Sequence, residues 1–292
     1  MSLGSLHRIR RQHVGCLLSY FPRVIMAFLI AILSGAANGQ EIIRFSGGNT
    51  LEISADLAEA ISDCNVVHAP DGCSDVFDMA DQGDRAALFL LSFWFLYQPG
   101  VQFESKQAAL RYMLALADDA MPLAMADVGA RHLSGNTRLG GIGVDPSIET
   151  GLRYLRAAFE AGVGSASLLL AREYDRGNIV EESQELATAH YELAAAQGNG
   201  LAGYLLALRR IRPLPSVGDI EYFRRYMAHS AERGFFLAIE GICQNRYEVL
   251  GDAEWFVFDD PEAVFTADET QHWCRELRDI NSSRAIVSND GN

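Results

Sequence analysis

A repeat of about 36 residues runs through most of this chain. Five segments align when each is started at an alanine, and the successive spacings are 37, 42, 36 and 36 residues. The column four residues later is apolar, the column five residues later holds small residues, and a glycine or alanine stands four residues before. The alanine column is Ala87, Ala124, Ala166, Ala202 and Ala238, and the preceding column is Gly83, Ala120, Gly162, Gly198 and Gly234. Agreement at several columns predicts one structural unit repeated in tandem.

Each unit contains two helical segments. Apolar residues recur at three- and four-residue steps in the segment after each alanine (the A helix) and in an alanine-rich segment that follows (the B helix). The B helices share an aromatic column, which is Tyr112, Tyr154, His190 and Tyr226. The glycines stand where a helix end requires left-handed backbone. Such helix pairs bury their apolar faces only by stacking. The predicted fold class is therefore all-α, a right-handed α/α solenoid of four to five repeats with capping segments.

Three stretches carry a resemblance to a known family. They are ASLLLAREYDRGN, then ATAHYELAAAQGNGLA, and GIGVDPSIETGLRYLRAAFEAG at residues 141–162. These resemble the Sel-one-like repeats, relatives of the tetratricopeptide repeats, over residues 79–247. Gly151 replaces the family's usual alanine, and the customary lysine of the B helix is missing. The resemblance implies a scaffold that binds other proteins, including exported proteins that restrain membrane sensors.

The segments on either side of the array are expected to cap its open ends. Residues 40–78 form the N-terminal cap, in which residues 40–53 are typical of a strand hairpin. Residues 248–292 form a C-terminal cap with a frayed, flexible tail from residue 281. The aromatic residues between 89 and 103 could line a ligand groove, but a packed interface between the first repeat and its cap is the interpretation we favour.

The first 39 residues have the pattern of a secretory signal peptide. Four arginines precede an apolar run at residues 24–33, and small residues follow with a suitable cleavage point before Gln40. A start at Met26 or an uncleaved anchor are the alternatives, although ten apolar residues are few against the roughly 20 that span a bilayer. We expect a periplasmic or secreted protein without a membrane span after cleavage.

Four cysteines remain after residue 39, and an even number in an exported chain predicts disulfides. Four cysteines allow three pairings. We expect the two local ones, Cys64 with Cys73 and Cys243 with Cys274. A metal site is the alternative, but the spacing Cys-x-x-Cys does not occur.

Charge and motif content argue against several functions. The net charge is −14, and because the first 39 residues hold four arginines and no acid, the remainder carries −18, which excludes counterion-driven binding to nucleic acid. Lys106 is the only lysine, and neither a phosphate-binding loop nor a nucleophile elbow nor a zinc helix is present. We therefore predict no catalytic residues, no cofactor and no metal.

A row of basic residues on the A helices is the candidate binding site. In tetratricopeptide-like solenoids the A helices line the concave face, and positions six to ten after each alanine turn away from the buried small residues. The predicted partner-binding residues are Arg131, His132, Arg172, Glu173, Arg176, Arg209, Arg210 and Arg212. Arginine forks suit carboxylates, so an acidic peptide or protein surface is the predicted partner. The arginines could instead pair with acids of neighbouring helices.

The sequence thus predicts a non-enzymatic adaptor of the cell envelope. Because some cysteine-rich members of the family are linked to penicillin binding, a β-lactamase-like or cell-wall hydrolase is the second hypothesis. A glycan-binding envelope protein is the third, and it would show exposed aromatic residues instead of arginines on the concave face.

Overall fold

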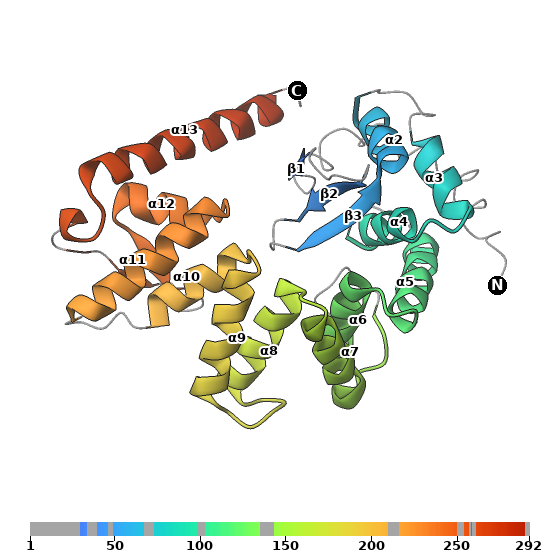
Figure 1. Cartoon of the computed structure of the whole chain (residues 1–292), viewed down its shortest axis with the longest axis horizontal. Coiled ribbons are helices and arrows are strands. Elements are labelled where there is room, and N and C mark those ends of the chain that lie inside the picture. Colours follow the sequence, from blue (N-terminus) through green and yellow to red (C-terminus); the bar gives the residue numbers. More distant parts are fainter. Residues whose placement is uncertain are drawn as a thin grey trace. The chain divides into compact units, whose positions relative to one another are not determined.

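The computed structural model describes residues 30–33, 40–45, 49–66, 73–97, 103–134, 143–209, 216–249, 254–256, 258 and 261–289. These residues form two compact units, and the boundary between Ala166 and Ser167 falls inside helix α8 (Gly164–Arg176). Figure 1 shows the succession of helices along the chain. The predicted domain boundaries, after residues 39, 78 and 247, do not include this division.

A and B helices alternate in both units, which confirms the predicted all-α repeat fold. The first unit has A helices α4 (Arg85–Tyr97) and α6 (Pro122–Ser134) and B helices α5 (Phe103–Asp118) and α7 (Ile148–Glu160). The second contains α8 from Ser167 onward, the A helices α10 (Gly200–Arg209) and α12 (Phe236–Gln244), and the B helices α9 (Gln184–Ala196) and α11 (Val217–Glu232).

The repeat columns have the physical roles that their residue types predict. All five alanines of this column are fully buried, and the apolar residues four positions later are buried as well. Every member of the preceding column has positive φ, from 56° to 93°. Four of these five residues are glycines, which adopt this backbone without a Cβ clash. The fifth, Ala120 at φ 56°, holds a conformation that is unfavourable for a side chain.

Two glycines explain the tight packing of α6 against α7. A Cβ added to Gly151 would lie 2.6 Å from Leu133 Cδ2 and 3.0 Å from the carbonyl oxygen of Gly129. A Cβ added to Gly129 would lie 2.9 Å from Leu155 Cγ. The departure from the usual alanine at Gly151 therefore permits a closer approach of the two helices than any side chain would.

The N-terminal cap is a three-stranded antiparallel sheet followed by two helices. The strands are β1 (Ile30–Leu33), β2 (Gln40–Arg44) and β3 (Thr50–Ser54), and the helices are α2 (Ala55–Val66) and α3 (Ser74–Asp81). The pairing of β2 with β3 confirms the predicted hairpin. Strand β1 was not predicted: it comes from the apolar run of the proposed signal peptide, whose β-branched and aliphatic residues also suit a strand. Apart from the four residues of β1, residues 1–39 lie outside the described residues.

Contacts of Phe45 and Asn49 connect this cap to the helices of the first unit. The Phe45 ring packs edge-on against Phe89 and Phe93 of α4, with centroids 6.2 and 6.1 Å apart. The side-chain oxygen of Asn49 accepts a hydrogen bond of 3.0 Å from the backbone N–H of Ser165, and its amide donates to Ser165 Oγ at 2.9 Å. Asn49 thus caps the first turn of α8. The α4 aromatics therefore form a packed interface with the cap, as we favoured.

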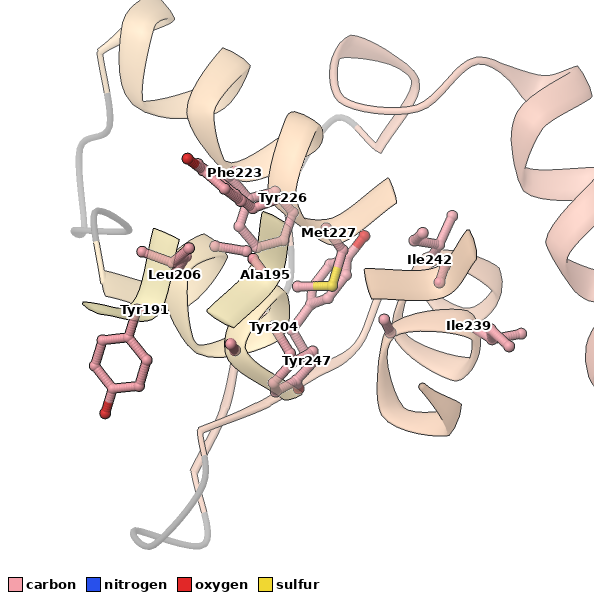
Figure 2. Close-up of a cluster of buried hydrophobic side chains, with 14 of the residues drawn as sticks. Tyr191, Ala195, Tyr204, Leu206, Phe223, Tyr226, Met227, Ile239, Ile242 and Tyr247 are labelled. Carbon is pink, nitrogen blue, oxygen red and sulfur yellow. The ribbon is translucent and has the colours of Figure 1, made fainter. Parts of the chain in front are cut away.

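The core of the second unit is rich in aromatic residues (Figure 2). Tyr204, Phe223 and Met227 are fully buried between the helices. Phe223 packs edge-on against Tyr247 at 4.9 Å and Phe258 at 5.1 Å between ring centroids. Tyr247 and Phe258 come from the segment after α12, so this segment covers part of the core of the last helices.

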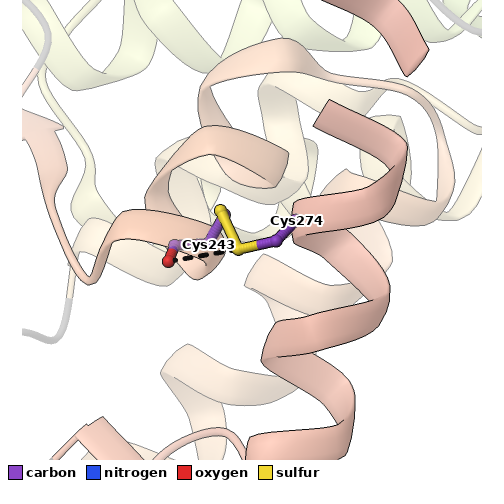
Figure 3. Close-up of a disulfide and its surroundings, with 2 residues drawn as sticks. All are labelled: Cys243 and Cys274. Carbon is purple, nitrogen blue, oxygen red and sulfur yellow. Dashed lines mark hydrogen bonds between the residues drawn. A yellow bond between two sulfur atoms is a disulfide. The ribbon is translucent and has the colours of Figure 1, made fainter. Parts of the chain in front are cut away.

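That cap comprises β4 (Tyr247–Val249), β5 (Glu254–Phe256), the 3₁₀ helix η3 (Pro261–Ala263) and α13 (Ala267–Asn289). A disulfide between Cys243 and Cys274 joins α12 to α13 with 4.9 Å between the Cα atoms, which confirms that pairing (Figure 3). Cys73 is also disulfide-bonded, and the Cys64 side chain predicted to be its partner lies outside the described residues.

The prediction of a frayed tail from residue 281 was wrong. Helix α13 continues to Asn289, although the placement of its last side chains lies outside what is described. The reason is visible in the sequence, because the segment after residue 281 contains no helix-breaking glycine or proline before Gly291.

Candidate functional site

A buried polar cluster joins the two A helices of the first unit. The Tyr97 hydroxyl of α4 donates a hydrogen bond to Asp127 Oδ1, and Arg131 Nε donates to Asp127 Oδ2 at 2.7 Å. The Arg131 guanidinium also lies over the Tyr97 ring, 5.2 Å from its centroid. Burial and then Asp127 raise the pKa of Tyr97. Burial alone would lower the pKa of Arg131, but Asp127 and Tyr97 raise it above its ordinary value, so the guanidinium stays charged.

The prediction that Arg131 lines a binding surface was wrong. Its side chain has no solvent exposure, and Asp127 beside it is 8% exposed. The physical reason is helical periodicity: Arg131 lies seven residues, about two turns, after the buried Ala124 and therefore on the same face. A charge at that depth requires a partner, and Asp127, one turn earlier on α6, supplies it.

The same three residue types meet again in the second unit, nearer the surface. Arg209 Nη1 of α10 donates to Asp175 Oδ1 of α8 at 2.7 Å, and the Tyr191 hydroxyl of α9 lies 3.4 Å from Asp175 Oδ2. The Arg209 guanidinium lies 5.3 Å from the Tyr191 ring centroid and also donates to Gln184 Oε1. Here the arginine and aspartate side chains are 20% and 31% exposed.

Electrostatics add Arg172 to this second cluster. Burial and then Asp175 raise the pKa of Tyr191 to about 12, while Arg209 and Arg172 act in the opposite direction. Arg172 and Glu173 are half-buried, and Arg176 at the end of α8 is exposed. Within the described residues, neither Arg172 nor Arg176 has a carboxylate at ion-pair distance, in contrast to Arg209.

The remaining predicted residues do not join this cluster. His132 belongs to the first unit, where its Nδ1 lies 3.0 Å from the carbonyl oxygen of Asp145 and its ring stacks on Tyr154. Arg210 and Arg212 lie outside the described residues. The structure therefore brings together Arg172 and Arg209, with Arg176 further along the same helix as Arg172.

Sequence reasoning missed the groups that hold the arginines in place. Asp127 and Arg131 could have been paired by their four-residue spacing on one helix. Asp175 and Arg209 are 34 residues apart, close to one repeat length, which is the signal for contact between successive A helices. Tyr97 and Tyr191 gave no local signal.

A cavity between α4 and α5, lined by Leu91, Phe95 and Tyr112 among others, has an accessible volume of about 10 Å³, enough for no more than one water. No cluster of three or more metal-binding side chains occurs within the part of the chain that is described. A search of those same ranges for a helix both long and apolar enough to span a bilayer found none.

Comparison with known proteins points to one fold. No family model matches the sequence, and no curated protein matches it. The structure is similar to that of a Sel1 repeat protein from Oxalobacter formigenes, with a TM-score of 0.56 and 18% identity over 77% of this chain and 85% of that one. It is also similar to c5321, a protective antigen present in uropathogenic Escherichia coli strains that displays an SLR fold, with a TM-score of 0.50 and 19% identity. That match covers 74% of this chain and 44% of the antigen.

The alternation of A and B helices and these similarities define a helical repeat protein. Its particular fold is the Sel1-like repeat fold, as the resemblance of residues 79–247 implied.

Proposed function

We propose that this chain is an exported, non-enzymatic adaptor that binds an acidic peptide or protein surface through the A helices of its second unit. The observation that carries the proposal is the difference among its arginines. Arg131 and Arg209 are paired with aspartates, whereas the half-buried Arg172 and the exposed Arg176 have no carboxylate at ion-pair distance within the described residues. The chain has a net charge of −14, so two guanidinium groups on one A helix provide a local positive charge that can attract an anionic partner.

Arg209 supports this site indirectly. Its ion pair neutralises the Asp175 carboxylate, and both Arg209 and Arg172 lie near enough to Tyr191 to affect its pKa. The contact of the Arg209 guanidinium with the Tyr191 ring holds these two side chains in place at the proposed binding site. The partner that we propose is a protein of the cell envelope, such as the exported domain of a membrane sensor.

The test is partner capture with the mature chain. Chemical crosslinking in the envelope fraction should recover one dominant partner, and the double variant Arg172→Gln, Arg176→Gln should lose most of it while unfolding at the same urea concentration as wild type. Arg275→Gln with Arg278→Gln on α13 is the matched control, because it removes the same charge from exposed positions of the same unit. Equal recovery by both double variants would refute the proposed site.

Export and the absence of turnover need separate measurements. Cell fractionation with N-terminal sequencing should find a periplasmic or secreted chain that starts at Gln40. The hydrolase hypothesis is supported by no specific constellation among the described residues, and we expect nitrocefin and peptidoglycan assays to stay at background. Turnover that co-purifies with the chain and is lost on its unfolding would replace the adaptor with an enzyme.

A further inference from the structure

An apolar stripe runs along the outer face of α9. Leu186 and Leu193 are 45% and 39% exposed, and Ala189 and Ala196 on the same face are also exposed. Their spacing of three, seven and ten residues from Leu186 places all four within one narrow face of a helix. The opposite face, which includes Ala187, Tyr191 and Ala194, is buried in the core of the second unit, so the stripe has no partner within that core.

The repeat does not require this stripe. At the positions shifted by one repeat of 36 residues, the neighbouring B helices carry mainly polar and charged side chains. These are Thr150, Arg153, Ala157 and Glu160 on α7, and Tyr222, Arg225, His229 and Glu232 on α11. The B helices α7, α9 and α11 therefore differ in their outer faces, and of these three only α9 presents leucines to solvent.

Carboxylates line one side of the stripe. Glu185 and Glu192 each precede a leucine by one residue, and both are exposed. Glu192 also accepts a hydrogen bond of 3.3 Å from the Tyr226 hydroxyl of α11, which fixes this side of the stripe toward α11. Among the described contacts no hydrogen bond or ion pair involves the Glu185 side chain, whereas Glu192 has the Tyr226 hydroxyl as a partner.

We infer that the outer face of α9 binds an amphipathic helix of a partner protein, with leucine-like residues against the stripe and lysine or arginine beside Glu185. Helix-in-groove recognition uses anchors at this spacing. The acidic flank and the net charge of −14 oppose a second copy of the chain and an anionic lipid surface, and both favour a basic helix. One helix face is small compared with the roughly 1,200 Å² of a stable interface, so the expected affinity is micromolar.

The test uses a fluorescein-labelled synthetic helix with leucines at positions i, i+3, i+7 and i+10 and lysines on one flank. Fluorescence anisotropy should show saturable binding to the wild-type chain. Leu186→Gln with Leu193→Gln should weaken binding by ~10-fold or more, since the bound peptide would no longer cover two leucine side chains. Glu185→Gln should weaken it several-fold and flatten its dependence on salt. Arg153→Gln and Thr150→Gln at the equivalent positions of α7 form the control and should leave binding unchanged.

Three results would overturn the inference. One is equal affinity for the wild type and the leucine variant, and another is equal binding of a scrambled peptide of the same composition, which would mean attraction by charge alone. The third is a concentration-dependent dimer in sedimentation that the leucine substitutions abolish, because a second copy would then cover the stripe. The leucine substitutions lie on exposed positions of a B helix and leave Arg172 and Arg176 intact, so capture through the arginines can fail or succeed independently.

Discussion

The two units use the same three side-chain types at different depths. In the first unit Arg131 and Asp127 are buried beside the half-buried Tyr97, and in the second the Asp175 and Arg209 side chains next to Tyr191 reach the surface. A buried charge pair is costly to break because the remaining partner stays desolvated, whereas a partly exposed pair is rehydrated. The comparison teaches that an arginine in a repeat column has no fixed role: its depth decides whether it holds the fold together or meets a partner.

The largest expected effect comes from breaking the buried pair. Arg131→Met leaves the Asp127 carboxylate buried and unpaired, and should lower the free energy of unfolding by about 3–5 kcal/mol. Arg209→Met should cost about 1 kcal/mol or less, because water can solvate Asp175. Urea unfolding followed by hydrogen exchange in α6 and α10 measures both. Adding Asp127→Asn to Arg131→Met should recover part of the loss. Similar losses for the two single variants would contradict the comparison.

The second unit relies on its disulfide more than on its polar cluster. Replacing Cys243 and Cys274 by serine opens a crosslink between residues 31 positions apart, and should cost roughly 3 kcal/mol in unfolding free energy. Thermal unfolding of the double variant, with exchange read out in α12 and α13, is the measurement. A loss no larger than that of Arg209→Met would show that the C-terminal cap holds α13 without the crosslink.

Substitution of a helix-end glycine in each unit allows the stabilities of the two units to be compared. Gly162 in the first unit and Gly234 in the second have φ of 85° and 74°, and an added Cβ would meet nothing within 4 Å at either. Substitution of either by alanine should therefore cost about 1 kcal/mol through backbone conformation alone. Ala120→Gly should stabilise the first unit by a smaller amount, because it relieves the same strain. Urea midpoints test all three, and clearly unequal losses at Gly162 and Gly234 would mean that one unit is generally weaker.

The last effect is absent at neutral pH and appears only at alkaline pH. The pKa of Tyr191 is raised to about 12, above the value of about 10 of an unfolded chain, so its neutral phenol favours the folded state. That contribution is complete below pH 10 and is lost as the pH rises toward 12. The variant Tyr191→Phe should flatten the decline in stability over this range. Tyr97→Phe should flatten it further, because burial and Asp127 raise the pKa of Tyr97 more strongly than that of Tyr191. A pH profile unchanged by both substitutions would contradict this account.

The repeat itself could be predicted because its information is local. The spacing of alanines and glycines predicted the helix pairs and the left-handed turns, since each column reports one backbone or packing requirement. Arg131 was misplaced although its seven-residue spacing from the buried Ala124 and its four-residue spacing from Asp127 are both local signals, and only the contact of Asp127 with Tyr97 requires α4 and α6 to meet. The Cys243–Cys274 pair was predictable from parity and spacing, whereas β1 was not, because its residues fit both an export signal and a strand.

The hydrogen bonds between Asn49 and Ser165 span 116 residues of sequence. The chain is synthesised from its amino end, so the helices α2 to α7 are made after Asn49 and before its partner Ser165. The start of α8 is in turn finished only by a residue from far upstream. Removing the amino-terminal hairpin, for instance to obtain a minimal repeat fragment, would therefore leave the first turn of α8 without the hydrogen bonds of Asn49.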